Sequence, residues 1–139
     1  MTLLHDNGVS TPLDDEYFHR AESQVLEWID SIHSLMADDA ALRADLGRLK
    51  RDREVIEQEW WRDGLVTGSN AEARQNTLAL LRRESRPYQA LTLDLEVTES
   101  NLAMVQRDLE RAREMRSLSK RRLEFAIATR QWHAAGTVD

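Results

Sequence analysis

Apolar residues recur at alternating intervals of three and four along the first part of the chain. The positions are Phe18, Ala21, Val25, Trp28, Ile32, Leu35, Asp39, Leu42, Leu46, Leu49, Arg53, Ile56 and Trp60. All except Asp39 and Arg53 are apolar. A spacing that averages 3.5 residues over several heptads is typical of a coiled coil. The pattern predicts a helix over about residues 12–62, with Thr11 as its N-cap and Pro12 at the first helical position.

A polar segment with two glycines, residues 63–70, interrupts this pattern and predicts a loop. Ser69 and Glu72 have the spacing of a capping box, which predicts that a short helix begins there and covers about residues 70–84. Pro87 marks the boundary with the next element, because the residue before a proline disfavours helical geometry.

A second long helix is predicted over about residues 87–133. Its apolar seam comprises Tyr88, Leu91, Leu95, Thr98, Leu102, Val105, Leu109 and Ala112. After Ala112 the large apolar residues spread around the helix: Met115, Leu118, Leu123, Phe125, Ile127 and Trp132. This spread predicts a drift of the heptad register, or an end of the helix that is buried on more than one side. Gly136 is a reasonable stop signal.

Two long helices of similar length with a short connector predict an all-α fold, a long antiparallel helical hairpin of coiled-coil type. We expect one domain over residues 11–135, preceded by a flexible tail over residues 1–10. If Trp60 packs near Leu91, the two seams run side by side along the whole hairpin.

The charge distribution favours the antiparallel direction. Residues 1–47 contain two Arg against ten Asp or Glu, whereas residues 105–139 contain eight basic and five acidic residues. Antiparallel packing places the acidic arm beside the basic arm, although each exposed ion pair contributes only ~0–1 kcal/mol.

The two polar seam positions fit the same register. Asp39 is expected to face Ala112, and Arg53 is expected to face Thr98. Polar residues at seam positions often fix the register of a coiled coil at some cost in stability.

Further apolar residues lie off the seams, so a solitary hairpin leaves them exposed. They are Leu26, Ile29, Met36, Val55, Leu93, Val97, Met104 and Leu118. A second apolar face predicts a partner, most simply another copy of the chain, and therefore a homo-oligomer.

The sequence gives little support for catalysis or for metal binding. The chain has no Cys, its four His are dispersed, and it lacks both HExxH and GxxxxGK[ST] motifs. We therefore expect a protein that is not an enzyme and that holds no metal or cofactor. No apolar run is long enough to span a membrane, and residues 1–10 do not have the pattern of a signal peptide, which predicts a cytoplasmic protein without a membrane partner.

Arginine combined with aromatic residues is the composition of single-strand nucleic-acid binding, in which charge follows the backbone and rings stack on bases. The candidate residues are Trp61, Arg62, Arg74, Arg82, Arg83, Arg86, Lys120, Arg121 and Arg122. Two alternatives stand beside this interpretation: the basic run of the last helix pairs with the acidic arm, and Trp60, which lies on the seam, belongs to the core. Trp61 lies off the seam and is the better stacking candidate.

The layout resembles a known family. A long helix ends in Trp60-Trp61-Arg62-Asp63-Gly64, a short helix follows, and the last helix has a basic, apolar-rich end from Arg116 to Gly136. This resembles UvsY-type phage recombination mediators. The stretch from Gly68 to Arg74 and the pair Pro87-Tyr88 are also similar to small coiled-coil proteins encoded by phages.

This resemblance implies a ring-like oligomer that binds single-stranded DNA and helps to load a RecA-like recombinase onto strands covered by single-strand binding protein. It also implies the host cytoplasm as the location. The family has basic residues just ahead of the aromatic pair, where this chain has Val55, Glu57 and Glu59. Any DNA contact there therefore shifts to Arg62, to the following loop, or to Lys50, Arg51 and Arg53.

The sequence thus predicts an oligomeric helical accessory protein that binds single-stranded DNA in recombination or DNA repair, with a recombinase or single-strand binding protein as its partner. The alternatives are a structural or adaptor coiled coil without nucleic-acid binding, and a regulator whose acidic arm mimics DNA.

Overall fold

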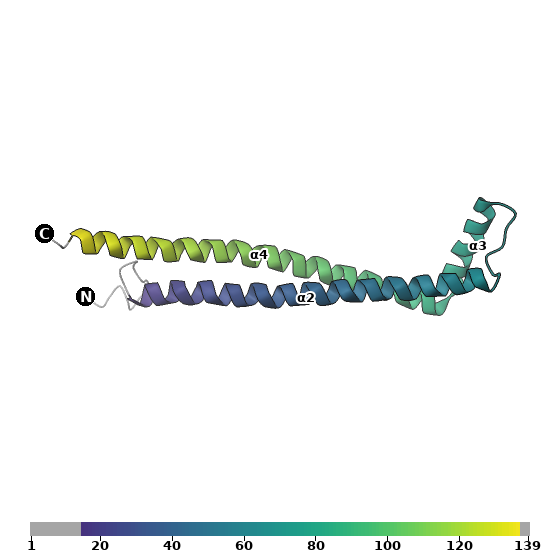
Figure 1. The fold of residues 1–139 in the computed structure, drawn as a ribbon, viewed down its shortest axis with the longest axis horizontal. Helices are drawn as coiled ribbons and strands as arrows, with labels where there is room; N and C mark the ends of the chain where they lie inside the picture. Colours follow the sequence, from purple (N-terminus) through teal and green to yellow (C-terminus); the bar gives the residue numbers. More distant parts are fainter. Residues whose placement is uncertain (1–14, 137–139) are drawn as a thin grey trace. The chain divides into compact units, whose positions relative to one another are not determined.

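The computed structural model describes residues 15–136, which form three α-helices and no strand (Figure 1). Helix α2 covers Asp15–Arg62, α3 covers Ala71–Glu84 and α4 covers Arg86–Gly136. The all-α class and the order of a long, a short and a long helix are confirmed. The predicted tail over residues 1–10 and the predicted N-terminal cap of the first helix lie outside the described residues.

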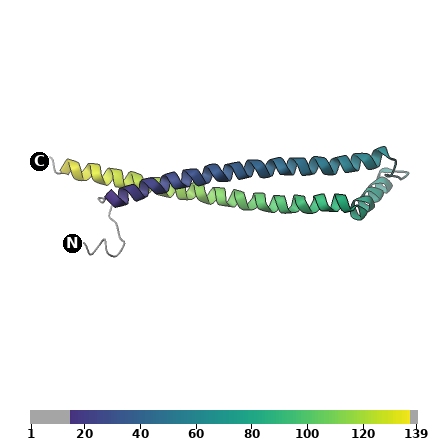
Figure 2. The same ribbon diagram turned by 90° about the horizontal axis from the view of Figure 1, so that it is seen from below.

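The chain divides into two compact units, and both long helices take part in each of them. Unit 1 joins the first part of α2, up to Met36, to the part of α4 from Arg107 onward. Unit 2 comprises residues 37–106, which include the end of α2, all of α3 and the start of α4. Within each unit α2 and α4 pack together and run antiparallel, as the two views in Figures 1 and 2 show.

The predicted seam of α2 is confirmed along its whole length. Each of its thirteen positions from Phe18 to Trp60 is buried or half-buried. Ala21, Ile32 and Leu49 are the most covered, with 4–5% of their surface exposed. A two-helix contact covers only one stripe of each helix, so this regular burial is the signature of coiled-coil packing.

The core of unit 1 corrects the expected register. Ile32 packs with Leu109 and Ala112, and Trp28 and Leu35 lie against this cluster. Ala112, which was expected to face Asp39, therefore contacts a residue one heptad earlier in α2.

Asp39 has a different partner from the one expected. Its carboxylate accepts a hydrogen bond from Arg43 Nε at 2.8 Å, one turn along the same helix. The expected pairing of Asp39 with Ala112 is therefore wrong, since Ala112 packs with Ile32, and a role of Asp39 in fixing the register stays a prediction.

The heptad seam of α4 does not drift after Ala112. It continues through Ser119 and Ala126, which are 1% and 0% exposed. The large residues Phe125 and Trp132 lie outside it, with 58% and 79% of their surfaces exposed. The drift predicted from the sequence was wrong because it followed the bulky apolar residues, whereas the seam is carried by small residues that let two helices approach closely.

Unit 2 differs from the expected register as well. The Trp60 ring packs against Tyr88, one turn before Leu91, with ring centroids 5.5 Å apart. The Arg53 guanidinium lies over the Tyr88 ring at 5.6 Å, instead of facing Thr98. Tyr88 is the first seam residue of α4, and it contacts both polar and aromatic residues near the end of α2.

The helix boundaries around α3 are set by two capping residues. Asn70, and not Ser69, is the N-cap of α3, because its side-chain oxygen accepts a hydrogen bond from Ala73 N–H at 2.8 Å. Ser85 ends α3 and begins α4: its N–H donates to Leu81 O, and its hydroxyl oxygen accepts from Tyr88 N–H. One residue therefore joins the two helices without a loop.

The continued seam makes a stability prediction. Ala126→Leu inserts a large side chain where no surface is exposed, so we expect the free energy of unfolding to fall by roughly 1–3 kcal/mol in urea denaturation. Ala103→Leu on the exposed face of the same helix is the matched control and should change it by less than about 0.5 kcal/mol. Equal effects of the two substitutions would mean that the seam does not reach Ala126.

Candidate nucleic-acid interface

The basic residues of α4 between positions 107 and 122, here called the basic stretch, are all exposed. They are Arg107, Arg111, Arg113, Arg116, Lys120, Arg121 and Arg122. Within residues 15–136 none of them forms an ion pair with an acidic side chain. Of the residues described, only Arg130 of α4 pairs with α2, through Asp15. The acidic arm therefore leaves the basic stretch available to another anion.

The acidic residues of α2 pair mainly along their own helix. Glu16 and Arg20 form an ion pair at 2.8 Å, and Arg48 lies between two aspartates, at 3.8 Å from Asp45 and 3.7 Å from Asp52. Side chains three or four residues apart on a helix reach each other without any tertiary contact. Other acidic residues of the arm form no ion pair among the described residues, so the opposite charges of the two arms meet only at Asp15 and Arg130.

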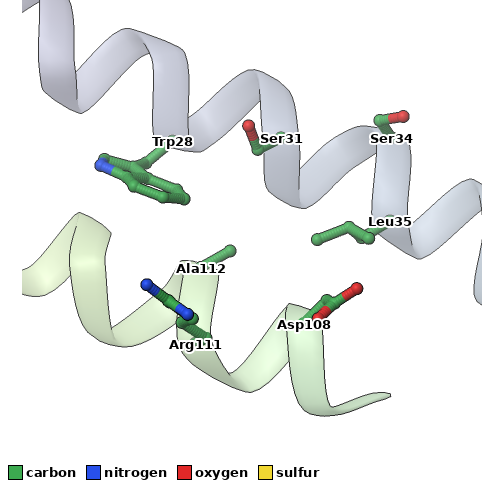
Figure 3. Close-up of a pocket in the computed structure, with 7 residues that line it drawn as sticks. All are labelled: Trp28, Ser31, Ser34, Leu35, Asp108, Arg111 and Ala112. Carbon is green, nitrogen blue, oxygen red and sulfur yellow. The ribbon is translucent and has the colours of Figure 1, made fainter. Parts of the chain in front are cut away.

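Three surface hollows follow the α2–α4 contact in unit 1, and each has a cation of the basic stretch at its edge. The first, called the Trp28 hollow, is shown in Figure 3. Its lining residues are Trp28, Ser31, Ser34 and Leu35 from α2, and Asp108, Arg111 and Ala112 from α4. Ala112, Ser31 and Ser34 are small, and the half-buried Trp28 side chain lines the hollow together with Arg111.

The other two hollows separate residues that are adjacent in sequence. Arg122 lines a hollow together with Tyr17, Arg20, Ala21 and Gln24 of α2. Lys120 lines a different hollow, with Arg116, Ser117, Leu123, Val25 and Ile29. Successive residues on a helix point about ~100° apart, so Lys120, Arg121 and Arg122 face three directions and do not form one cluster.

In unit 2, the Arg82 side chain already has an acidic partner. Its Nε donates to Glu57 Oε1 at 2.6 Å, and the Tyr88 hydroxyl donates to the same oxygen at 2.9 Å. Because Glu57 neutralises Arg82 within the fold, Arg82 has less charge to offer a nucleic acid than the unpaired arginines, and its role as a contact stays a prediction. This Glu57 cluster, formed by Glu57, Arg82, Tyr88 and the nearby Arg53, instead ties α3 and α4 to the end of α2.

The Glu57 cluster perturbs the ionisation of its members. Burial acts to raise the pKa of Glu57, but the hydrogen bonds from Arg82 and Tyr88, with the charges of Arg82 and Arg53, outweigh burial and lower that pKa. The pKa of Tyr88 is raised by burial and by its hydrogen bond to Glu57. The hydrogen bond to Glu57 also raises the pKa of Arg82. The carboxylate is therefore held in its charged form.

The remaining candidates of unit 2 lie on different elements. Trp61 is 47% exposed near the end of α2, and Arg62 lies 3.7 Å from Asp63. Arg74 is half-buried on α3 and donates to the Gly68 carbonyl at 3.5 Å. Arg83 and Arg86 are exposed. Trp61, Arg62, Arg83 and Arg86 are therefore exposed, whereas Arg74 is not.

The loop before α3 is held by its own contacts. Gly68 has a φ of +148°, and a Cβ there would lie 2.7 Å from both Ala73 Cβ and Arg74 N. The Thr77 hydroxyl donates to Thr67 O at 2.8 Å, and Val66 is buried. Position 68 therefore requires glycine so that the loop can close onto α3.

Two aromatic residues that are not among the sequence-predicted candidates, Trp28 and Tyr17, line these hollows beside arginines. Trp28 was assigned to the seam, yet it also lines an open hollow beside Arg111. Tyr17 lies beside Arg122 in a second hollow. The spacing of Trp28 gave no sign of this, because accessibility depends on the small residues that the other helix places opposite it.

The described residues contain no cluster of three or more His, Cys, Asp or Glu side chains positioned to hold a metal ion. Between residues 15 and 136, no helix is both long and apolar enough to cross a membrane.

Comparison with protein-family profiles, with curated proteins and with solved structures gives no match to this chain.

The Glu57 cluster predicts a pH-dependent contribution to stability. Because folding lowers the pKa of Glu57, its contribution is present above the ordinary value of 4.5 and is lost as the pH falls through the folded pKa. We expect Glu57→Gln to lower the free energy of unfolding by about 1–2 kcal/mol at pH 7 and to have less effect at pH 3.

Urea denaturation at both pH values measures this difference. The matched control is Glu59→Gln, an exposed glutamate two residues away, which should leave both values nearly unchanged. An effect of Glu57→Gln that is the same at pH 3 and pH 7 would contradict a charged Glu57 in the folded state.

Proposed function

We propose that the protein binds single-stranded DNA through the basic stretch of α4, and that it acts as a self-associating accessory protein in recombination or DNA repair. The observation that carries this proposal is the exposure of the basic stretch without acidic partners among the described residues. Cations that are not neutralised within the fold release counterions from a bound polyanion, which is the main source of affinity for a DNA backbone.

Accessible aromatic rings favour a single strand over a duplex. Trp28 lines a hollow beside Arg111, and Trp61 is about half exposed in unit 2. Bases of a single strand can stack on such rings, whereas the bases of a duplex are stacked on each other. Because the cations point in several directions, they fit a flexible strand better than the fixed groove of a duplex.

The resemblance in helix layout is the basis for two parts of this proposal. They are the role in recombination and the partner, a recombinase or single-strand binding protein. The exposed apolar side chains of α4 support a protein partner or a second copy in general terms. They favour the adaptor function equally, so DNA binding is the property that separates the two.

The basic stretch makes the first functional prediction. In fluorescence anisotropy with a labelled single strand at 50 mM salt, we expect the triple change Lys120→Gln, Arg121→Gln, Arg122→Gln to weaken binding roughly 10- to 100-fold. The slope of log affinity against log salt should decrease by about 2, since each lost contact removes about 0.7.

The control changes Arg43 and Arg48 to Gln, which removes two positive charges from α2. Arg43 and Arg48 already have acidic partners on their own helix, so we expect a loss of less than about threefold. Equal losses per charge removed in the two variants would show only a dependence on net charge. No binding of the unaltered protein below about 10 µM would contradict the proposal and favour the adaptor.

Trp61 makes a separate prediction about stacking. Trp61→Ala should weaken single-strand binding roughly tenfold, because stacking of one base contributes about 1–3 kcal/mol. Leu65→Ala is the control, as Leu65 is similarly exposed in the neighbouring loop but has no ring. An unchanged affinity of Trp61→Ala, with unchanged helicity by circular dichroism, would remove Trp61 from the interface.

A further inference from the structure

The apolar stripe of unit 1 consists of Leu118, Phe125 and Trp132, which occur seven residues apart on α4. Their exposed fractions are 38%, 58% and 79%. A seven-residue repeat places side chains on one face of a helix, so these three lie in a row. Ser119 and Ala126, one position further along, are buried against α2, which shows that the stripe belongs to a different face.

We propose that the apolar stripe is a contact for a second copy of this chain, in which the two α4 helices lie antiparallel about a twofold axis at Phe125. This deepens the self-association part of the proposed function and rests on it. In such a pair, positions equidistant from Phe125 meet, so Leu118 of each copy lies against Trp132 of the other and the two Phe125 rings meet at the axis. The largest side chain thereby faces the smallest of the stripe.

The charges beside the stripe select the antiparallel direction. Arg121 and Arg122 adjoin the stripe, and in the antiparallel pair they lie opposite Thr129 and Ala128, which are small and neutral. In a parallel pair each arginine lies opposite its own copy, and like charges in that position repel.

The register is selected by the same reasoning. The seven-residue repeat continues backwards from Leu118 to Arg111. A twofold axis at Arg111 brings two guanidinium groups together, whereas an axis at Phe125 brings two aromatic rings together, an arrangement that stabilises interfaces.

The area of the apolar stripe determines how strongly two copies are expected to associate. From their exposed fractions, the three side chains offer roughly 400 Å² per copy, or about 800 Å² for the pair. This is about half of a standard interface, so the contact is weak and reversible. We expect the dimer to form over a concentration range of roughly 10–100 µM.

Sedimentation velocity over that range tests whether the stripe carries the association. Phe125→Arg places two cations at the twofold axis and should leave the chain monomeric at all concentrations. Ile127→Arg is the matched control, because Ile127 is an exposed apolar residue two positions away that is not part of the stripe, and this variant should dimerise like the unaltered chain. Circular dichroism at 1 µM checks that both variants keep their helicity.

Oxidative cross-linking tests the direction, since the natural chain has no Cys. We expect Phe125→Cys to give a covalent dimer at 50 µM, and Trp132→Cys alone to give none. An equal mixture of Trp132→Cys and Leu118→Cys should cross-link. A parallel pair would instead cross-link Trp132→Cys alone, and that result would overturn the proposed arrangement.

The other possible results distinguish association through the apolar stripe from association through another surface. A Phe125→Arg variant that still dimerises would overturn the stripe and leave self-association through another face. An unaltered chain that stays monomeric at 100 µM would overturn both. If it stays monomeric and Phe125→Arg changes single-strand binding while Ile127→Arg does not, the stripe is a surface for bases and not for a second copy.

Discussion

The structure depends on one constraint: two paired helices bury only one stripe each. In unit 1 that stripe consists of Ile32 and its neighbours on α2, and of Leu109, Ala112, Ser119 and Ala126 on α4. Among residues 15–136 no third layer covers this pair, so the side chains outside the stripe remain at the surface. The exposure of the basic stretch and of the apolar stripe follows directly, and both candidate functions use surface that the fold does not need for itself.

A seam of similar apolar residues packs almost equally well when one helix is shifted by a heptad. Contacts in unit 2 show how one register is selected. Glu57 accepts hydrogen bonds from Arg82 of α3 and Tyr88 of α4, so three helices meet at one carboxylate. A heptad shift of α4 would separate these groups and leave the half-buried carboxylate without partners, which is unfavourable. Directional polar contacts therefore select among pairings that the apolar seam by itself treats as nearly equal.

The charge asymmetry of the chain has a different role from the one its distribution suggested. Acidic residues of α2 are engaged by arginines one turn away, as in the pairs Glu16–Arg20 and Asp39–Arg43, while Arg130 provides one contact between the long helices. The basic stretch is thus a property of the surface and not of the core. This distinction makes a polyanionic ligand a consistent proposal for a chain whose net charge is −6.

The sequence alone determined the helices, their order, the seam of α2 and the exposure of Trp61, because each depends on local periodicity and on turn residues. It did not determine the register, the continuation of the α4 seam through Ser119 and Ala126, or the pairing of Arg82 with Glu57. The tertiary structure decided these, since small seam residues carry no hydropathy signal and Glu57, Arg82 and Tyr88 are brought together only by packing. Periodicity identifies which face of a helix is buried, but only the packed neighbour decides which residue it meets.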